Sequence, residues 1–300
     1  MQSKKEKLKK LFPQGKVNIN GEIFNPEEAQ ISIFDRGFLY GDSVYETFPA
    51  YNKKPLFLDD HIERLWNSAA LLSLELSYSK EEIIKEMNKI IQATGLDDIY
   101  LRIIITRGES SIGLISDDPE NNLIIIAKDL PVNPDWWYEK GVSVYITGIL
   151  RNDPKATNSN SKSENYLNNI MAHMDARKHN FYDAVMANKE GHITEGTTNN
   201  TWMVKDNTIY TPPLTAGLLR GITREKVLEA IKSKTQYQVK EANFTTQEFL
   251  NADEAFLTSS LRGVVPITQI NQNVLGKGPG KITRDLIEKY QELVDEYLKM

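Results

Sequence analysis

The chain has 300 residues, enough for one large or two medium domains, and its 40% hydrophobic and 26% charged residues are ordinary values for a globular protein. A net charge of −5 argues against nucleic acid as the main partner, and the absence of cysteine excludes disulfides, thiolate catalysis and cysteine metal sites. Since the four histidines are scattered and no apolar run approaches the length of a membrane span, we expect a cytoplasmic protein without a metal site or a membrane partner.

The N-terminal residues 1–15 are rich in lysine and have no apolar core after their charges, so we do not expect them to be a secretory signal. We expect a short, solvated basic arm there. Alternating apolar residues then predict strands over 17–21, 31–34 and 44–48.

Two helices are predicted next. The first has Asp59 or Asp60 as its expected N-cap and an apolar face over 62–72. The second follows Ser79, which begins a capping pattern, and ends at Gly95.

Two mixed α/β domains are the architecture that these patterns predict. Apolar runs over 100–106 and 123–127 predict buried strands, and two prolines with two tryptophans mark a linker. The expected division is a basic arm (1–15), a small N-terminal domain (16–130), an interdomain linker (131–141) and a larger C-terminal domain (142–300) with helices near 164–178, 222–233 and 281–298.

Residues 161–196 carry the pattern on which the functional interpretation depends. Lys162 directly precedes a segment whose apolar residues over 166–174 have the spacing of one helix face, a strand is predicted over 183–187, and Glu195 lies in the next strand-like run. A lysine at the end of an element can act as a nucleophilic amine when its surroundings lower its pKa. A carboxylate opposite it could keep a ring nitrogen protonated. Taken alone, Lys162 is more typical of a solvated loop lysine.

Three further signals are weak individually. His61 and Arg64 share one helix face, which is typical of an ordinary amphipathic helix but also of an arginine fork aimed at a phosphate. Gly221 precedes a predicted helix. The first N–H groups of this helix could bind an anion, or Gly221 could be an ordinary N-cap. The strand over 254–260 ends in three hydroxyl residues, which often close turns and occasionally bind phosphate.

In this order the signals closely resemble the fold-type IV pyridoxal-phosphate enzymes, which comprise branched-chain aminotransferases, D-amino-acid aminotransferases and aminodeoxychorismate lyases. The resemblance extends from residue 17 to about residue 271. The motifs that carry it are Asp35-Arg36-Gly37 with Gly41-Asp42, His61-x-x-Arg64, Lys162-x-x-Asn165-Tyr166-Leu167, Glu195-Gly196, Gly221-Ile222-Thr223-Arg224 and residues 258–263. It implies a two-domain α/β (α+β mixed) fold, pyridoxal 5′-phosphate between the domains, and a homodimer in which a second subunit completes the substrate pocket.

The resemblance also implies a role for each matching residue. Lys162 would join covalently to the cofactor aldehyde and carry a proton between the substrate Cα and the cofactor C4′. Glu195 would pair with the pyridine nitrogen, and Tyr166 would hydrogen-bond the ring O3′. The implied phosphate and ring contacts are Arg64, the backbone of Ile222 and Thr223, the Ser260 hydroxyl, and Leu219 against the ring face.

For the substrate, Tyr100 and Arg102 lie on the same face of a predicted strand and resemble the Tyr-x-Arg of branched-chain aminotransferases, where these side chains help hold substrate carboxylates. A surface ion pair is the alternative for Arg102. Tyr45, Ser260 and Leu261 are also expected in the substrate pocket.

The other members of the group stay open as alternatives. D-amino-acid aminotransferases carry an arginine and a histidine shortly after the Thr-Arg-Gly turn, where this chain has Ile112 and Leu114. A D-specific enzyme would need another cation, and the candidates are Arg36, Arg102 and Arg262. The run Ser260-Leu261-Arg262-Gly263 looks more like lyases, although lyases tend to have threonine where this chain has Glu46.

We therefore expect a pyridoxal-phosphate-dependent aminotransferase that moves an amino group between a branched-chain L-amino acid and a 2-oxo acid such as 2-oxoglutarate by a ping-pong mechanism. A non-enzymatic, cofactor-binding relative is opposed by the presence of both Lys162 and Glu195. Contacts of a homodimer are expected at Trp136, Trp137 and the loop over 109–119.

Overall fold

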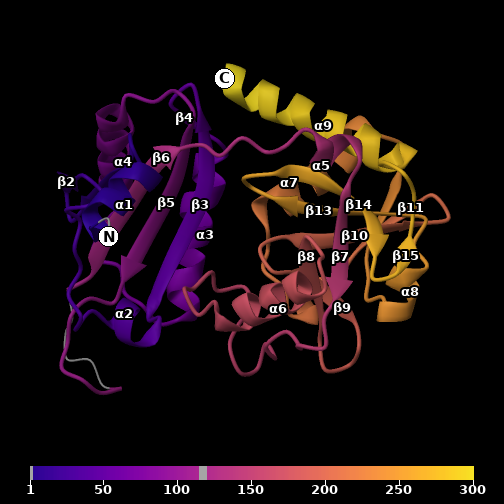
Figure 1. Ribbon diagram of the computed structural model, residues 1–300, viewed down its shortest axis with the longest axis horizontal. Coiled ribbons are helices and arrows are strands. Elements are labelled where there is room, and N and C mark those ends of the chain that lie inside the picture. The colour runs from indigo at the N-terminus through magenta and orange to yellow at the C-terminus, as the bar shows by residue number, and fades with distance from the viewer. Residues whose placement is uncertain (1–2, 115–119) are drawn as a thin grey trace. The chain divides into compact units, whose positions relative to one another are not determined.

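The chain folds into two compact units, each with its own sheet (Figure 1). The structure, a computed structural model, describes residues 3–114 and 120–300. The first unit contains the chain up to residue 131 together with 161–165, and the second contains 132–160 and 166–300. The two-domain mixed α/β fold expected from the sequence is confirmed. The segment with Lys162 belongs by its contacts to the first unit, although the residues on both sides of it belong to the second.

The first unit is built on a six-stranded antiparallel sheet in the order β2-β1-β6-β5-β3-β4. Its strands are β1 (Lys16–Ile19), β2 (Glu22–Phe24), β3 (Ser43–Tyr51), β4 (Lys54–Pro55), β5 (Ile99–Thr106) and β6 (Asn122–Asp129). Its helices are α1 (Lys4–Leu11), α2 (Arg36–Tyr40), α3 (Leu58–Leu71) and α4 (Lys80–Thr94).

One face of this sheet forms the core with α3 and α4. Side chains alternate across a strand, so Val44 and Phe48 of β3 point into this core together with Leu65 of α3. The same alternation places Glu46 on the core face and Tyr45 on the opposite face of β3. Glu46 and Tyr45 therefore contact different sets of charged residues.

The structure confirms the predicted start of α4 but not that of α3. Ser79 and Glu82 form the expected capping box of α4, and Gly95 ends the helix in the left-handed region at φ +69°. The prediction that Asp59 or Asp60 caps α3 is wrong, because the helix begins at Leu58 and its N-cap position is Phe57, at φ +51°. Both aspartates lie instead in the first turn, where they interact favourably with the helix dipole.

The strand predicted over residues 31–34 is also wrong. The Asp35 N–H donates to the Ser32 carbonyl and the Phe34 N–H to the Ser32 hydroxyl, so this segment is a turn. Ile33 and Phe34 are exposed. Their alternation therefore does not come from packing against a sheet.

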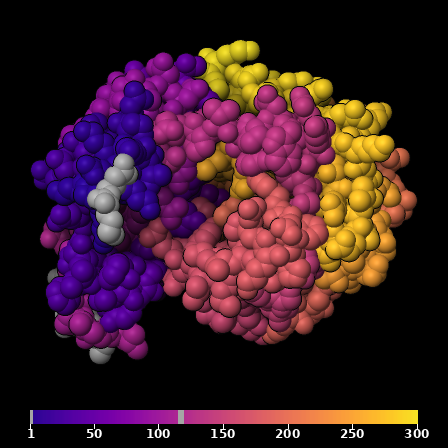
Figure 2. Space-filling model, in the orientation of Figure 1, coloured from indigo at the N-terminus to yellow at the C-terminus, as the bar shows by residue number. Residues whose placement is uncertain are grey.

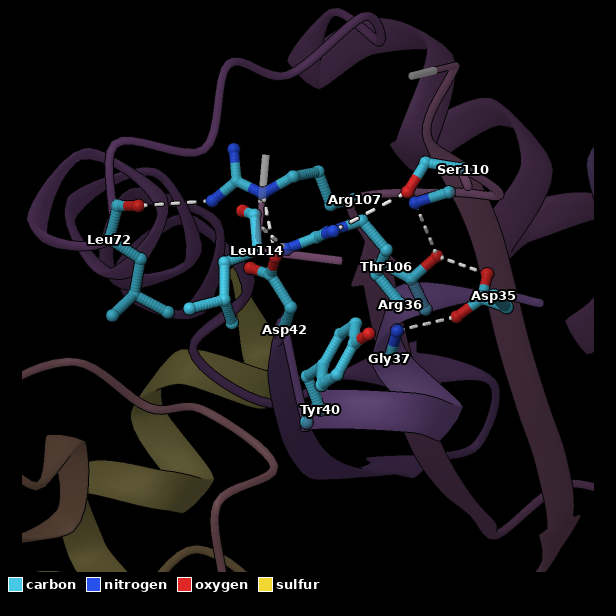
Figure 3. A network of polar contacts seen from close by, with 12 residues as sticks. Asp35, Arg36, Gly37, Tyr40, Asp42, Leu72, Thr106, Arg107, Ser110 and Leu114 are labelled. Carbon is cyan, nitrogen blue, oxygen red and sulfur yellow. Dashed lines mark hydrogen bonds and ion pairs between the residues drawn. The ribbon is translucent and has the colours of Figure 1, made fainter. Parts of the chain in front are cut away.

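Asp35 is a buried hub of this turn (Figure 3). Its carboxylate accepts the N–H groups of Gly37 and Phe38 at the start of α2. It also accepts the Thr106 hydroxyl and the Asn122 side-chain amide, each at 2.7 Å, from the ends of β5 and β6. The Asp35-Arg36-Gly37 motif thus joins α2 to two strands.

A second acid, Asp42, pairs with two arginines (Figure 3). Its Oδ2 atom accepts from Nε of Arg36 at 2.9 Å and from Nε of Arg107 at 2.8 Å. Partial burial opposes ionisation of Asp42, but the hydrogen bonds from Arg107 and Arg36 outweigh it and hold the pKa of the carboxyl below its usual range. Arg36 also donates to the carbonyls of Gly113 and Leu114, so it is already bound within the first unit.

The second unit contains a nine-stranded mixed sheet with a main path in the order β12-β11-β10-β13-β14-β7-β8-β9. Its strands are β7 (Val142–Ile146), β8 (Asp183–Ala187), β9 (Ile193–Gly196), β10 (Asn200–Lys205), β11 (Thr208–Thr211), β12 (Gln238–Glu241), β13 (Glu254–Ser259), β14 (Gly263–Ile270) and β15 (Asn273–Val274), which pairs with β14. Its helices are α5 (Trp136–Glu139), α6 (Leu167–Lys178), the 3₁₀ turn η1 (Leu214–Ala216), α7 (Ile222–Lys234), α8 (Thr246–Leu250) and α9 (Lys281–Lys299). None of the helices in the described part of the chain could cross a membrane.

The connection from β7 to β8 contains both Lys162 and α6. These strands are parallel, so the chain must return to the other end of the sheet, and α6 makes part of this crossover. Ala172 and Ala176 of α6 pack in the core. Ile170 and Met174, in contrast, are exposed, so the apolar face predicted over 166–174 is a surface and not a core face.

The stretch 131–141, expected as a linker, contains α5. Trp137 packs against the core of the second unit and meets the Tyr182 ring edge-on, with 4.9 Å between ring centroids. Trp136 is exposed. Of the expected dimer contacts, Trp137 is thus largely used inside its own unit, and residues 115–119 of the loop lie outside the described residues.

Candidate active site

The backbone of Lys162 is fixed by two elements of the first unit. Its N–H donates to the Ser68 hydroxyl of α3 at 3.0 Å, and its carbonyl accepts the Tyr45 N–H of β3 at 2.9 Å. Val44 and Ser163 form an isolated antiparallel bridge beside it. The lysine is therefore attached to β3 and α3 and does not lie on a solvated loop.

The same segment is held at its end by Asn165, whose side-chain amide donates to the Gly41 carbonyl at 2.9 Å. Gly41 has φ +66° and ends α2, and a Cβ atom there would lie 2.9 Å from Oδ1 of Asn165. The left-handed backbone conformation favours glycine at this position, and a larger residue would push against the Asn165 side-chain amide.

The Lys162 side chain lies against the ring of Tyr45. Its Nζ atom is 3.3 Å from the Tyr45 Oη atom and 4.4 Å from the ring centroid. The Arg102 guanidinium carbon lies 3.9 Å from the same centroid, and Nη2 of Arg102 donates to Oε1 of Glu164 at 2.6 Å. We call Lys162, Tyr45, Arg102 and Glu164 the amine cluster.

Tyr100 lies next to this cluster along β5. As predicted, Tyr100 and Arg102 lie on the same face of the strand, since both are partly exposed and alternate with buried Ile99 and Leu101. The Lys128 ammonium is 5.1 Å from the Tyr100 ring centroid. This face of the sheet thus carries cations and phenols together.

On the core face of β3, Glu46 is fully buried and binds both His61 and Arg64 of α3. Nε and Nη2 of Arg64 donate to the two carboxylate oxygens of Glu46, each at 2.7 Å, in the bidentate geometry of strong arginine–carboxylate pairs. Nδ1 of His61 is 2.6 Å from Oε2 of Glu46. The fork of Arg64, predicted to point at a phosphate, is therefore occupied by Glu46.

The charges of this cluster follow from burial and pairing. Burial alone would raise the pKa of Glu46, but Arg64 and His61 outweigh it and lower the pKa to about 2. Burial lowers the pKa of His61 more than Glu46 raises it, so the imidazole is neutral at pH 7 and its Nδ1–H donates to the carboxylate. Glu46 and Arg64 together then carry no net charge.

We expect Glu46→Gln to lower the free energy of unfolding by on the order of 3 kcal/mol at pH 7, because it leaves the buried Arg64 charge without its partner. The pKa of Glu46 in the folded protein, about 2, lies below the ordinary value of 4.5. Its stabilising contribution is therefore complete above about pH 4.5 and is lost as the pH falls toward 2. Urea unfolding of both proteins between pH 3 and pH 8 measures this.

The matched control is Glu63→Gln, since Glu63 pairs with Lys80 on the exposed side of α3. This control is expected to leave stability nearly unchanged. A difference between wild type and Glu46→Gln that does not shrink below pH 4.5 would contradict the assigned ionisation of Glu46.

In the second unit, Glu195 lies buried in β9 with both oxygens engaged. Oε1 accepts from Nε of Arg151 at 2.8 Å, and Oε2 accepts the backbone N–H of Leu219 at 3.0 Å. Nη1 of Arg151 continues to Oδ1 of Asn168 on α6. Each carboxylate oxygen can accept more than one hydrogen bond, so Glu195 keeps capacity for a further donor.

The start of α7 follows closely in the same unit. Gly221 precedes it, and no side chain in the described ranges caps it, so the first N–H groups, including those of Ile222 and Thr223, have no acceptor within the helix. A Cβ atom at Gly221 would lie 1.9 Å from Oδ1 of Asn200, which itself donates to the Leu219 carbonyl. Glycine is therefore needed for the close approach of β10 to this turn.

The remaining predicted residues are distributed over the second unit. Tyr166 is the half-buried residue before α6. Ser260 and Leu261 form the turn between β13 and β14, and the Leu261 carbonyl accepts from Asn133 at 2.9 Å. Arg262 in this turn donates to the Tyr182 hydroxyl at 2.9 Å.

Three charged residues of these clusters are not among the predicted site residues. Glu46 could be found from the sequence, because it occupies a core-facing position between Val44 and Phe48, where an acid requires a buried partner. Arg151 and Glu164 have no local pattern that marks them. Their partners, Glu195 and Arg102, are distant in sequence.

The chain is similar in sequence to members of one known family. Residues 43–270 match the family described as amino-transferase class IV. The chain is 32% identical over 281 residues to the putative branched-chain-amino-acid aminotransferase of Methanocaldococcus jannaschii, covering 93% of this chain and 96% of the relative. It is 33% identical over 279 residues to the D-alanine aminotransferase of Bacillus licheniformis, covering 90% and 94%.

A solved structure with the same fold is that of the branched-chain aminotransferase from the thermophilic archaeon Thermoproteus uzoniensis with norvaline. The TM-score is 0.87 at 30% sequence identity, and the match covers 95% of this chain and 97% of that one. The similarity thus includes both units.

Proposed function

Because this chain belongs to the class IV aminotransferase family, whose members use pyridoxal 5′-phosphate, we propose that it moves an amino group between a branched-chain L-amino acid and a 2-oxo acid such as 2-oxoglutarate. The reaction would run in two half-reactions, in ping-pong order. The observation that carries the proposal is the amine cluster, in which the Lys162 amine is held beside a phenol and the Arg102 guanidinium.

The donor set fits a phosphorylated pyridine aldehyde. An aldehyde requires a primary amine, supplied by Lys162, and a protonated ring nitrogen requires a carboxylate with spare acceptor capacity, supplied by Glu195. A phosphate dianion is suited to the uncapped start of α7. Pyridoxal 5′-phosphate supplies, when bound, a ring that accepts electrons from the substrate carbon.

Each residue then has a defined task. Lys162 would hold the cofactor aldehyde and, once displaced by the incoming amino acid, its amine would take the proton from the substrate Cα and return it at C4′. Glu195 would keep the ring nitrogen protonated, and Tyr166 would donate to the ring O3′. The phosphate would be held by Arg64, the N–H groups of Ile222 and Thr223, and the Ser260 hydroxyl, with Leu219 packed on the ring.

Arg64 would contribute hydrogen-bond donors to the phosphate, but no net positive charge. Its fork is neutralised by buried Glu46. The attraction for a phosphate dianion would then come mainly from backbone N–H groups and the helix dipole of α7.

The substrate would be bound on the partly exposed face of β3 and β5. Arg102 would hold a carboxylate, and Tyr45 and Tyr100 would lie beside it. Ser260 and Leu261 of the second unit are proposed as substrate contacts from the family resemblance alone. Arg102 is well suited because a guanidinium can bind a carboxylate in a fork.

D-amino-acid transfer is the second candidate, and the similarity to a D-alanine aminotransferase favours it. Against it, the positions at which a cation would be expected are occupied by Ile112 and Leu114, and both side chains are exposed. Of the other arginines considered, Arg36 is bound to Asp42 and Arg262 to Tyr182. In a D-specific enzyme, Arg102 would then be the arginine that binds the carboxylate of the D-amino acid, the same residue proposed to bind the L-amino acid.

A homodimer is also part of the proposal. Leu167, Ile170, Met171 and Met174 of α6 have the i, i+3, i+4, i+7 spacing of one helix face, and all four are exposed. Figure 2 shows the rose-coloured stretch that contains α6 on the face of the second unit turned toward the viewer. A contiguous apolar face of this kind favours a protein contact, and a second copy of the chain is the partner we propose.

The proposed function is tested by adding single amino acids to purified protein with bound cofactor and following the visible absorption of the cofactor. L-leucine and L-glutamate are expected to convert it to the aminated form, and 2-oxo acids are expected to reverse the change. A response to D-alanine or D-glutamate but not to the L-amino acids would favour the second candidate. Aminodeoxychorismate is tested separately, and release of an aromatic product from it, without any amino-acid response, would contradict amino-group transfer.

A further inference from the structure

Arg102 is already paired with a carboxylate of its own chain. Its Nη2 atom donates to Oε1 of Glu164 at 2.6 Å, and both side chains are about one quarter exposed. The contact is made through a single guanidinium nitrogen. Among the residues that the structure describes, the Nε and Nη1 atoms of Arg102 have no protein acceptor.

Glu164 does not need to hold Arg102 in place. The guanidinium lies 3.9 Å from the centroid of the buried Tyr45 ring, and stacking on an aromatic face positions an arginine by itself. The backbone of Arg102 is fixed in the middle of the sheet, where it pairs with Thr47 of β3 and Ile126 of β6. The ion pair with Glu164 therefore mainly neutralises the charge of Arg102 and contributes less to its position.

Glu164 belongs to the same short segment as Lys162. This segment is attached to β3 by the bridge between Val44 and Ser163 and to α2 by Asn165. The position of the Glu164 carboxylate is thus linked to that of the amine, which in the proposed function would take the proton from the substrate Cα.

We propose that Glu164 is a specificity-determining residue that competes with substrate carboxylates for Arg102 and disfavours substrates with two carboxylates. The inference rests on the proposed function, in which Arg102 binds a substrate carboxylate. A substrate carboxylate that forms a bidentate pair with Arg102 must displace the one-nitrogen contact of Glu164 or lie beside its negative charge.

Both routes weaken anion binding, and the effect is larger for a dianion. A dicarboxylate is repelled by Glu164 through two carboxylates, whereas a monocarboxylate is repelled through one. Glu164 therefore lowers the affinity of the site for dicarboxylates relative to monocarboxylates with apolar side chains, and 2-oxoglutarate remains a substrate that binds less tightly than it would without this charge.

The test is a calorimetric titration of the protein with bound cofactor. Glutarate is the dicarboxylate probe and pentanoate the monocarboxylate probe, and neither carries an amino or oxo group that could react. Glu164→Gln removes the charge but keeps an amide oxygen that can accept from Nη2 of Arg102. We expect this variant to bind glutarate about three- to tenfold more tightly than the wild type, with a smaller gain for pentanoate.

Two further variants show whether the gain acts through Arg102. Glu63→Gln makes the same substitution in the exposed pair with Lys80 and should leave glutarate affinity unchanged. Arg102→Met should weaken glutarate binding, and in this background the substitution Glu164→Gln should give no comparable gain. The inference is overturned if Glu164→Gln binds glutarate as weakly as the wild type or more weakly, or if its gain persists without Arg102.

Failure of this inference is distinguishable from failure of the proposed function. A Glu164→Gln variant that still aminates its cofactor with L-leucine but shows no gain for glutarate removes only the role of Glu164. A wild-type protein that does not respond to any amino acid removes the proposed function itself.

Discussion

Lys162→Ala is expected to abolish amino-group transfer, with turnover reduced by about 10⁴-fold or more. The substitution removes the primary amine that would hold the cofactor aldehyde and move the substrate proton, and the position of this amine is fixed by the attachment of its backbone to β3 and α3. Part of the cofactor should remain bound, because the groups proposed to hold its phosphate are unchanged. Steady-state turnover and cofactor content after gel filtration measure the two effects.

The appropriate control is Lys155→Ala, at an exposed lysine shortly before the same segment, and it should keep full activity. Thermal unfolding of Lys162→Ala should stay close to that of the wild type, since the backbone hydrogen bonds that attach the segment to β3 and α3 are kept. Turnover at the wild-type rate in Lys162→Ala would remove the assignment of this residue.

Glu195→Gln is expected to slow removal of the Cα proton by about 10²- to 10³-fold while changing cofactor affinity much less. The amide oxygen can still accept the Leu219 N–H or the Arg151 guanidinium, so the local structure is largely kept. An amide, however, carries no charge with which to keep a ring nitrogen protonated. Rapid mixing with L-leucine and with its Cα-deuterated form measures the proton-transfer step.

Glu190→Gln, at an exposed turn just before β9, serves as the matched control and should leave the rate unchanged. If Glu195→Gln weakens cofactor binding but reacts at the wild-type rate, the residue acts only in binding. The proposed role of Glu195 as the partner of the ring nitrogen is then wrong.

Elements that depend on neighbours in sequence are predictable. The capping box of Ser79 and the left-handed Gly95 define α4 locally, and the sequence pattern marks both. The start of α3 is not predictable in this way, because Phe57 takes a left-handed conformation and the helix begins without a side-chain cap. Alternation over residues 31–34 is misleading, since turns can also carry alternating apolar residues.

The same distinction holds for the candidate site: local motifs are predictable from the sequence, whereas contacts between residues distant in sequence are not. The motif around Lys162 marks the residue, but its place in the first unit depends on the bridge between Val44 and Ser163. The pairs of Arg64 with Glu46 and of Arg102 with Glu164 decide what these arginines can still bind. Such pairs join residues whose side chains meet only after the sheet has formed, so no spacing rule predicts them.

The arginines of the first unit illustrate why contacts decide function. Arg36 and Arg107 share Asp42 and bind backbone carbonyls, which makes them parts of the scaffold (Figure 3). Arg64 has its fork on a fully buried acid. Arg102, in contrast, stacks on Tyr45 beside Lys162 and makes one partly exposed ion pair, which is the arrangement best suited to exchange with a ligand.

The central claim, that the Lys162 amine is the group that holds the cofactor, is tested most directly by chemical trapping. Protein with bound pyridoxal 5′-phosphate is reduced with borohydride, digested and analysed by peptide mass spectrometry. The account predicts that the added cofactor mass is found on Lys162. Unmodified Lys162 with the cofactor mass on another lysine would contradict it.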